Sequence, residues 1–486
     1  MKKFLKYFAL VLVIAYLVLL IPDKKETDAV EIKSAPFAWN RDSLWNRLEN
    51  DFRSSRIGNR AASDSAIMTS LREQNNDLDN ITSHPQLLPQ DYPALLLPGF
   101  FSLSAELAAN PAKRDSLMEI YNKARILVKR RSENWDMNAP SVRNSLYQVL
   151  YGMRAGMEEV LLQSDSMAYS PVLLVENEPS TTPSADIAGI KVHSGDLLVS
   201  RGGAEVSAMI SRGNDYPGNF SHVALVYVDA VSGKASLIEA HIEKGVAVAT
   251  VDEYIADKKL RFMVLRPRAD LPKLIADPML PHKAAKDALD AALSHHTPYD
   301  FKMNFRDSTA LFCSEVGSLA YKHQGIRLWQ GVSTISSKGV INWLQEFGVK
   351  NFVTQMPSDL EYDPQLAVVA EWRDPQTLRK DHIDNAVMDV LLEKADSGKK
   401  ILYDHWKLPF VRVLKAWCML QNRFGKIGMI PEGMSATQAL KNQYFVKMYQ
   451  TLRKNTEANV DGFEKEFNYF PPYWQLVSIA RKTADE

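Results

Sequence analysis

Three residues in the middle of the chain carry the side chains that a cysteine hydrolase needs. His222 begins the run His-Val-Ala-Leu-Val-Tyr, Glu239 lies in Leu-Ile-Glu-Ala-His, and Cys313 lies in Leu-Phe-Cys-Ser-Glu-Val. A cysteine thiolate is a nucleophile, an imidazole can accept and return its proton, and a carboxylate can orient that imidazole. These residue types predict Cys313 as nucleophile, His222 as general base and acid, and Glu239 as the residue that orients His222.

The local pattern around each residue indicates how it is held. His222 and Glu239 lie in runs typical of strands, whereas Cys313 begins a run typical of a helix. A helix N-terminus and a nearby imidazolium both lower a thiol pKa, so we expect a reactive thiol. His241 follows Glu239 by two residues and would share its strand face, which makes it the alternative third member. Cys418, the other cysteine, lies in an apolar helical pattern and is predicted to be core.

Residues 189–341 alternate short apolar runs with tight turns. The runs predict strands at residues 195–200, 222–228, 235–240, 245–251 and 261–267. Helical patterns follow at 282–296 and 313–322. The whole segment is typical of an α+β domain with a small antiparallel sheet. Residues 201–220 contain Gly-Gly and Gly-Asn-Asp-Tyr-Pro-Gly, which predict an inserted loop.

Helical periodicity dominates on both sides of this segment. Residues 25–175 predict an all-helical region, in which the two prolines of residues 91–98 are expected to break the chain. Residues 176–188 are rich in Pro, Ser and Thr and predict a linker. Residues 342–486 predict a second all-helical region with many aromatic side chains, which are more often core than ligand-binding.

The first 24 residues form a targeting segment. Lysines at positions 2, 3 and 6 precede a continuous apolar run, Tyr7 to Leu20, which is typical of a signal peptide and short for a membrane span. Counted over residues 4–21, the run is also a marginal membrane anchor. The positive-inside rule predicts that the rest of the chain is exported to the periplasm or cell envelope. Cleavage and membrane anchoring both remain open.

The composition narrows the classes of partner. The chain has 486 residues, with 58 Lys+Arg and 58 Asp+Glu, so its formal net charge is zero. That balance removes a global electrostatic argument for binding nucleic acid. Two cysteines exclude a disulfide framework and a Cys-rich zinc site. We therefore expect a small-molecule or peptide substrate, and we predict neither a metal nor a cofactor.

An ordered series of short motifs resembles the permuted NlpC/P60 papain-like amidases of the YiiX/YebB type. The matching motifs contain Asp196, His222, Glu239, Tyr299 and Cys313 in that order. Ordinary papain-like enzymes place the cysteine first, whereas the permuted group has the order found here: histidine, third residue, cysteine. The resemblance implies that Cys313 forms a thioester, that Tyr299 helps to position substrate and that Asp196 ties down a loop near the site.

The resemblance and the export segment together imply hydrolysis of an amide bond. A cell-wall peptide, or a small γ-linked or N-acyl substrate, would suit an exported enzyme of this kind, although fold alone does not fix a substrate. One alternative keeps the nucleophile and makes the protein an acyl-lipid thioesterase or acyltransferase. A second alternative makes the helical flanks a non-catalytic envelope scaffold, with the papain-like domain as a binding module.

Overall fold

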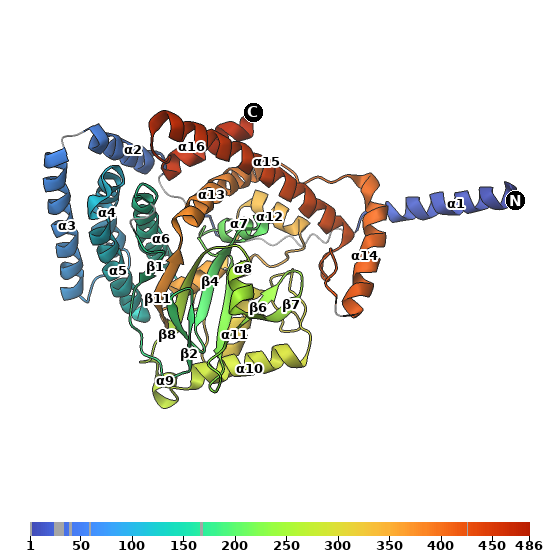
Figure 1. The fold of residues 1–486 in the computed structure, drawn as a ribbon, viewed down its shortest axis with the longest axis horizontal. Helices are drawn as coiled ribbons and strands as arrows, with labels where there is room; N and C mark the ends of the chain where they lie inside the picture. Colours follow the sequence, from blue (N-terminus) through green and yellow to red (C-terminus); the bar gives the residue numbers. More distant parts are fainter. Residues whose placement is uncertain (1, 24–33, 38–40, 58–59, 166–168, 425) are drawn as a thin grey trace.

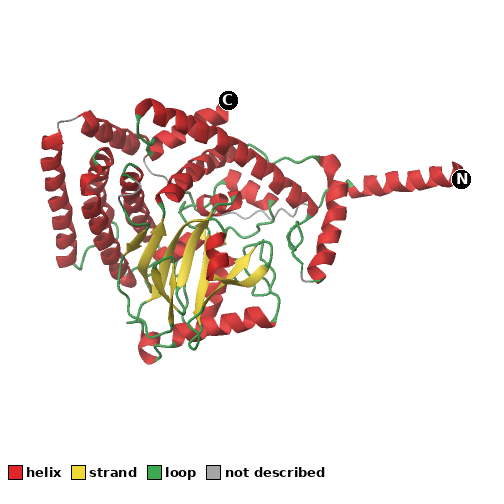
Figure 2. Ribbon diagram, in the orientation of Figure 1, coloured by secondary structure: helices red, strands yellow, loops and turns green. Residues whose placement is uncertain are grey.

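A computed structural model describes residues 2–23, 34–37, 41–57, 60–165, 169–424 and 426–486 (Figure 1). Helices gather at both ends of the chain, and one large antiparallel sheet lies between them (Figure 2). The boundary expected at residue 24 falls outside the described residues.

The sheet has seven strands in the order β1-β11-β8-β4-β5-β6-β7, and each neighbouring pair is antiparallel. In that order the strands are β1 (Val172–Leu174), β11 (Leu366–Arg373), β8 (Lys259–Pro267), β4 (Leu197–Gly202), β5 (His222–Val228), β6 (Ala235–His241) and β7 (Gly245–Thr250). Two short antiparallel pairs accompany it: the hairpin of β2 (Ser184–Ile187) with β3 (Ile190–His193), and the pair of β9 (Ser333–Thr334) with β10 (Val353–Thr354).

The sheet is larger than predicted because both flanks contribute to it. All five predicted strands are present, but β1 and β11 come from regions that we expected to be all-helical, and that expectation is wrong there. A short continuous apolar run such as residues 366–370 fits a buried strand or a buried helix equally well. Pairing with β8 along its length makes it a strand, since the unpaired edge of β8 would otherwise be left open.

The two faces of the sheet pack against different elements because successive strand residues point to opposite sides. The helices of this central region are α7 (Glu205–Arg212), α8 (Val251–Ala256), α9 (Pro272–Ala276), α10 (Leu280–Ser294), α11 (Cys313–His323) and α12 (Lys338–Glu346). Val223 and Leu265 pack with α10 and α11 on one face of the sheet, whereas Ala224 and Val264 pack with α8 and the β2–β3 hairpin on the other.

The N-terminal bundle packs around its own apolar core. Its helices are α2 (Arg41–Ile57), α3 (Arg60–Ser83), α4 (Asp91–Ala109), α5 (Arg114–Arg131) and α6 (Pro140–Leu162). The break expected at 91–98 is absent: Pro93 lies in the first turn of α4, where no helical N–H bond is needed, and Pro98 is accommodated inside. By length and composition α4 is apolar enough to cross a membrane, but 56% of its apolar window is buried in the bundle.

The C-terminal helices are α13 (Pro375–Asp396), α14 (Leu408–Arg423), α15 (Ala436–Phe467) and α16 (Tyr473–Asp485). Helices α13, α15 and α16 pack with α7 and α12 around a second core, whereas α14 packs against α15. Helix α1 (Lys2–Leu19) projects away from the rest of the protein next to α14 (Figure 1). The predicted linker at 176–188 lies against the sheet, where Glu178 is buried and accepts a hydrogen bond from the Ala269 N–H at 2.6 Å.

A buried carboxylate on α6 joins the bundle to the sheet and to α13. Glu158 accepts hydrogen bonds from Arg261 on β8 at 2.5 and 3.1 Å, and its Oε2 lies 3.0 Å from His382 Nε2 on α13. Burial alone would raise the pKa of Glu158, but Arg261, His382 and Arg373 hold it well below its ordinary value. The three parts of the chain therefore share one ionic contact that none can satisfy alone.

We predict that Glu158→Gln lowers the free energy of unfolding by ~3–5 kcal/mol, because it removes the buried carboxylate shared by Arg261 and His382 and leaves Arg261 with Asp381 alone. Denaturant unfolding measures this loss. The native pKa is depressed, so the contribution is present at neutral pH and is lost as the pH falls below the ordinary carboxyl range. Glu119→Gln is the control, since Glu119 forms an exposed pair with Lys123 at 2.9 Å and should change stability by less than ~0.5 kcal/mol. Equal effects of the two substitutions would contradict the prediction.

Candidate active site

One carboxylate binds two imidazoles at the end of the sheet. Ala224 on β5 pairs with Glu239 on β6, so His222, two residues earlier, shares the face of Glu239 and His241. His222 Nε2 lies 2.6 Å from Glu239 Oε2, and His241 Nε2 lies 2.9 Å from Glu239 Oε1. Both sequence candidates for the third residue therefore lie here. Glu239 contacts His222 directly, whereas His241 contacts the other carboxylate oxygen of Glu239.

Burial and hydrogen bonding oppose each other at these three residues. Burial would raise the pKa of Glu239, but the hydrogen bonds from His222 and His241 hold it far below its ordinary value. Burial lowers the pKa of His222, although Glu239 partly offsets the effect. A carboxylate and a neutral imidazole therefore form the resting pair at pH 7, with the Nε2 proton of His222 directed at Glu239. The side chains of His222 and His241 remain 17% and 21% exposed, so solvent reaches this edge.

Cys313 is the first residue of α11 and lies against the backbone beside His222. Its Sγ is 3.8 Å from the carbonyl oxygen of Ser221, the residue before His222. The backbone N–H of Phe312, the residue before Cys313, donates to the Glu315 carboxylate at 2.8 Å. This hydrogen bond fixes the start of α11. N–H groups in a first helical turn have no partner within the helix, so the thiol is placed where a developing oxyanion would meet free donors.

The state of the thiol differs from the one that the sequence predicts. We expected a lowered pKa, but burial raises the pKa of Cys313 to about 11. The side chain is only 3% exposed. Burial therefore destabilises the thiolate by more than the N-terminus of α11 stabilises it. At neutral pH the Cys313 thiol is therefore protonated, and the His222 imidazole is neutral.

Tyr299 lies near the Cys313 thiol. Burial is the main cause that raises its pKa well above the ordinary value, and Cys313 is the next. The segment that contains Tyr299 lies against β7, where the Val246 N–H donates to the Thr297 carbonyl at 2.9 Å. Gly245 allows this approach, because its φ is +71° and a Cβ there would lie 2.1 Å from the Thr297 oxygen.

Asp196 lies away from the other candidate residues. It precedes β4, and the β4 residue opposite His222 is Ser200, which lies about 13 Å further along the strand. Its carboxylate accepts two hydrogen bonds from Arg266, both at 2.8 Å, and one from the His193 N–H at 2.7 Å. The structure thus gives Asp196 a bidentate ion pair that ties the β2–β3 hairpin to β8, at the opposite end of the strands.

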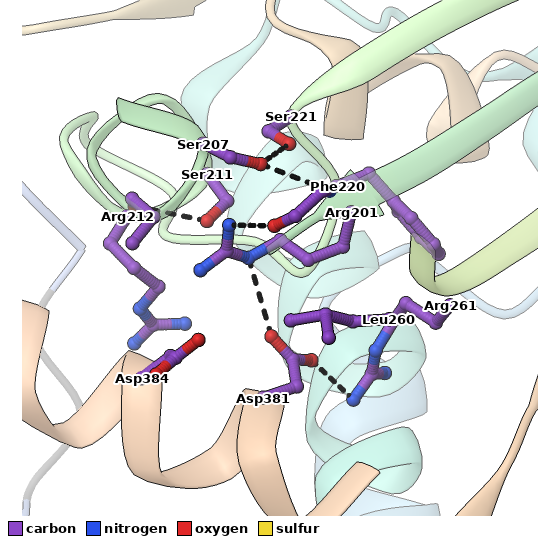
Figure 3. Close-up of polar contacts among 12 residues, drawn as sticks. Arg201, Ser207, Ser211, Arg212, Phe220, Ser221, Leu260, Arg261, Asp381 and Asp384 are labelled. Carbon is purple, nitrogen blue, oxygen red and sulfur yellow. Dashed lines mark hydrogen bonds and ion pairs between the residues drawn. The ribbon is translucent and has the colours of Figure 1, made fainter. Parts of the chain in front are cut away.

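Residues that the sequence did not single out support the histidine end of β5. The expected loop at 201–220 contains helix α7, whose Ser207 hydroxyl bonds the hydroxyl of Ser221 and accepts the Gly202 N–H at 3.0 Å (Figure 3). Below them, Asp381 lies between Arg201 at 3.3 Å and Arg261 at 2.7 Å (Figure 3). Single serines and arginines carry no spacing signal, so only the folded structure identifies them.

His222, Glu239 and His241 also place three potential metal ligands within 4.8 Å of one another. Imidazole and carboxylate are ligands that zinc accepts. In this structure the Glu239 carboxylate contacts one nitrogen of each imidazole, at 2.6 and 2.9 Å, which is the geometry of a carboxylate hydrogen-bonded to two histidines.

We predict that Glu239→Gln lowers the pKa of His222 further, because burial then acts without the carboxylate that opposes it. Histidine Cε1–H NMR signals followed against pH measure the shift, with His222 assigned by its loss in His222→Asn. His241→Asn is the matched control: it leaves the 2.6 Å contact in place and should shift His222 less. A larger shift in His241→Asn would assign the direct partnership to His241 instead.

Comparison with curated proteins and with solved structures found no match. Residues 191–370 match the model of one family, described as permuted papain-like amidase enzyme, YaeF/YiiX, C92 family. The matched segment runs from β3 into β11 and contains His222, Glu239 and Cys313. The predicted resemblance to YiiX-type permuted amidases is thereby confirmed for this segment. This part of the chain is similar to permuted papain-like amidases, which supports a thiol-dependent hydrolase of the amidase or peptidase type.

Proposed function

We propose that the protein is an exported cysteine hydrolase that cleaves an amide bond through a Cys313 thioester. The observation that carries the proposal is the position of Cys313 at the start of α11, against the backbone that leads into a Glu239-bound His222. Nucleophile, base and orienting group then come from three different elements of one packed domain, as a hydrolase requires.

In the proposed reaction the Cys313 sulfur attacks the substrate carbonyl carbon while its proton passes to His222. The Glu239 carboxylate stabilises the imidazolium that forms. N–H groups at the start of α11 stabilise the negative oxygen of the tetrahedral intermediate. His222 then protonates the departing amine, which leaves the acyl group on sulfur. Water, deprotonated by His222, hydrolyses the thioester and restores the thiol.

Two features support the proposed substrate class: the family match and the apolar N-terminal segment. An amide in a cell-wall peptide, or in a small γ-linked or N-acyl compound, suits a thiol amidase that is exported to the cell envelope. Helix α1 supports the proposed export to the cell envelope, since its side chains from Phe4 to Leu12 are exposed and almost entirely apolar.

Acyl-lipid chemistry is a second candidate that one observation favours. Phe301, whose ring centre lies 5.1 Å from that of Tyr299, also packs against the apolar residues beneath α14, a helix with a strongly apolar exposed side. An acyl chain could therefore approach along this wall. The mass of the trapped acyl-enzyme separates the two candidates: a peptide or amino-acid adduct supports the amidase, and a fatty-acyl adduct supports the lipid enzyme.

We predict that Cys313→Ala abolishes both the adduct and turnover with γ-glutamyl and N-acyl amide substrates. His222→Ala should lower kcat/KM by ~10²–10⁴, the usual contribution of a general base. Intact-mass spectrometry after acid quench and amine-release assays measure the two effects.

Cys418→Ala is the matched control, because Cys418 is the other buried cysteine and lies in a different cluster. It should retain the adduct and the activity. No turnover in the unsubstituted protein, together with an unchanged cellular phenotype when the gene carries Cys313→Ala, would favour the scaffold function, in which the papain-like domain only binds.

We predict that iodoacetamide modifies Cys313 slowly at neutral pH, more than about tenfold more slowly than an exposed thiol, and that the rate climbs steadily up to pH 9 and beyond. The reason is the burial that raises the pKa of Cys313 to about 11, so that little thiolate exists at pH 7. Peptide mass spectrometry reports Cys313 separately from Cys418. Fast modification at pH 5–6 that disappears in His222→Ala would contradict the neutral resting pair and establish a preformed thiolate–imidazolium pair.

A further inference from the structure

Helix α14 exposes a stripe of large apolar side chains to solvent. The stripe begins just before the helix and ends just after it, with spacings of four and three residues that place its members on one side: Trp406, Phe410, Val413, Trp417, Leu420 and Phe424. Their exposed fractions run from 44% at Leu420 to 76% at Phe424. Ile427 and Met429 extend the apolar surface into the next loop. A contiguous patch of this kind marks an interaction surface.

The opposite side of α14 already has a partner within the protein. Cys418 is completely buried and packs with Ile430 and Met434 against Phe301. The helix is thus apolar on both sides, held to the protein by one and open on the other. Packing within the chain accounts only for the Cys418 side.

The charged side chains in and just after α14 are all basic. Residues 405–431 contain five lysines and arginines and no acidic residue, in a chain whose net charge is zero. Arg423 and Lys426 are exposed on either side of the end of the stripe. Helices that lie in a membrane interface combine an apolar face rich in Trp, Phe and Leu with basic side chains that meet anionic headgroups.

Helix α1 leaves the protein at the same place. The Tyr16 hydroxyl donates to the Trp406 carbonyl at 3.2 Å, and its ring lies 6.2 Å from that of Phe410. Arg412 donates to the Leu19 carbonyl at 3.1 Å and binds Asp23 at 2.7 Å. In Figure 1, α1 points away from the protein and runs crosswise to α14. Its 18 residues span about 27 Å, close to the hydrocarbon thickness of a bilayer.

We infer that the Trp406–Phe424 stripe of α14, with Ile427 and Met429, is a membrane-docking surface that lies in the interface of a bilayer containing anionic lipid. With α1 inserted along the membrane normal, the crosswise α14 lies flat on the surface. Trp406 and Trp417 sit at headgroup level, and Arg423 and Lys426 meet the lipid phosphates. The surface is separate from the candidate active site, and it stands whether or not the domain is catalytic.

The test uses the full-length chain reconstituted in vesicles of phosphatidylcholine and phosphatidylglycerol. An environment-sensitive NBD dye is attached to cysteine in Trp417→Cys and in Phe424→Cys. Val231→Cys is the control, since Val231 is 96% exposed in the turn between β5 and β6. The natural cysteines are buried, and the unsubstituted chain measures their background. We expect blue-shifted emission at 417 and 424, and at least threefold stronger quenching there by doxyl-labelled lipid than at 231.

Further measurements show whether lipid or a second copy of the chain covers positions 417 and 424. Arg423→Gln with Lys426→Gln should weaken the lipid quenching at 417 in phosphatidylglycerol vesicles and leave it unchanged in phosphatidylcholine alone. Quenching at 417 and 424 no stronger than at 231 would overturn the proposal. Blue-shifted emission that depends on protein concentration and resists lipid-borne quenchers would also overturn it, because a second copy of the chain would then cover the stripe.

Discussion

The buried charges between α6, the sheet and α13 constrain the whole structure. Glu158, Arg261 and Asp381 are almost fully buried, and each has its partners on a different part of the chain. Further bonds of the same kind join Arg154 on α6 to Glu361 at 2.5 Å and Arg125 on α5 to Glu371 on β11. A buried ion without its partner is strongly unfavourable, so the helical bundle, the sheet and α13 must assemble together. What the sequence presents as three regions is one folded unit.

The candidate site uses that assembly. Arg201 and Arg261, which bind Asp381, belong to β4 and β8, the strands that order the sheet next to β5. The Ser207 hydroxyl on α7 forms a hydrogen bond with the hydroxyl of Ser221, and this bond positions the backbone just before His222. The short His222–Glu239 contact, at 2.6 Å, needs β5 and β6 in one register, because a slip of a single residue would turn Glu239 to the other face. The position of the His222 imidazole thus depends on the buried ion pairs of Asp381 with Arg201 and Arg261.

The sequence predicted the central part well because its signals are local. Alternating apolar runs located β5 and β6, the loop chemistry located the turns, and the order of His222, Glu239 and Cys313 led to the family that residues 191–370 match. Long-range effects were missed. Strand β11 forms because β8 needs a partner, and the raised pKa of Cys313 follows from tertiary burial that a helix-start pattern cannot reveal. The position of Asp196, which the resemblance placed near the site, also depends on a distant residue: its partner Arg266 is 70 positions further along the chain.

The contribution of both flanks to one sheet sets where the polypeptide can be divided. The family match ends at residue 370, in the middle of β11, which pairs with β8 through Arg373. A fragment trimmed to that match would lose β1 and the end of β11, and would leave the backbone N–H and C=O groups of β8 near Phe262 open to other chains. Open strand edges are templates for self-association. Recombinant pieces of this protein should therefore retain residues 172–174 and 366–373, so that the edge is covered by its own chain.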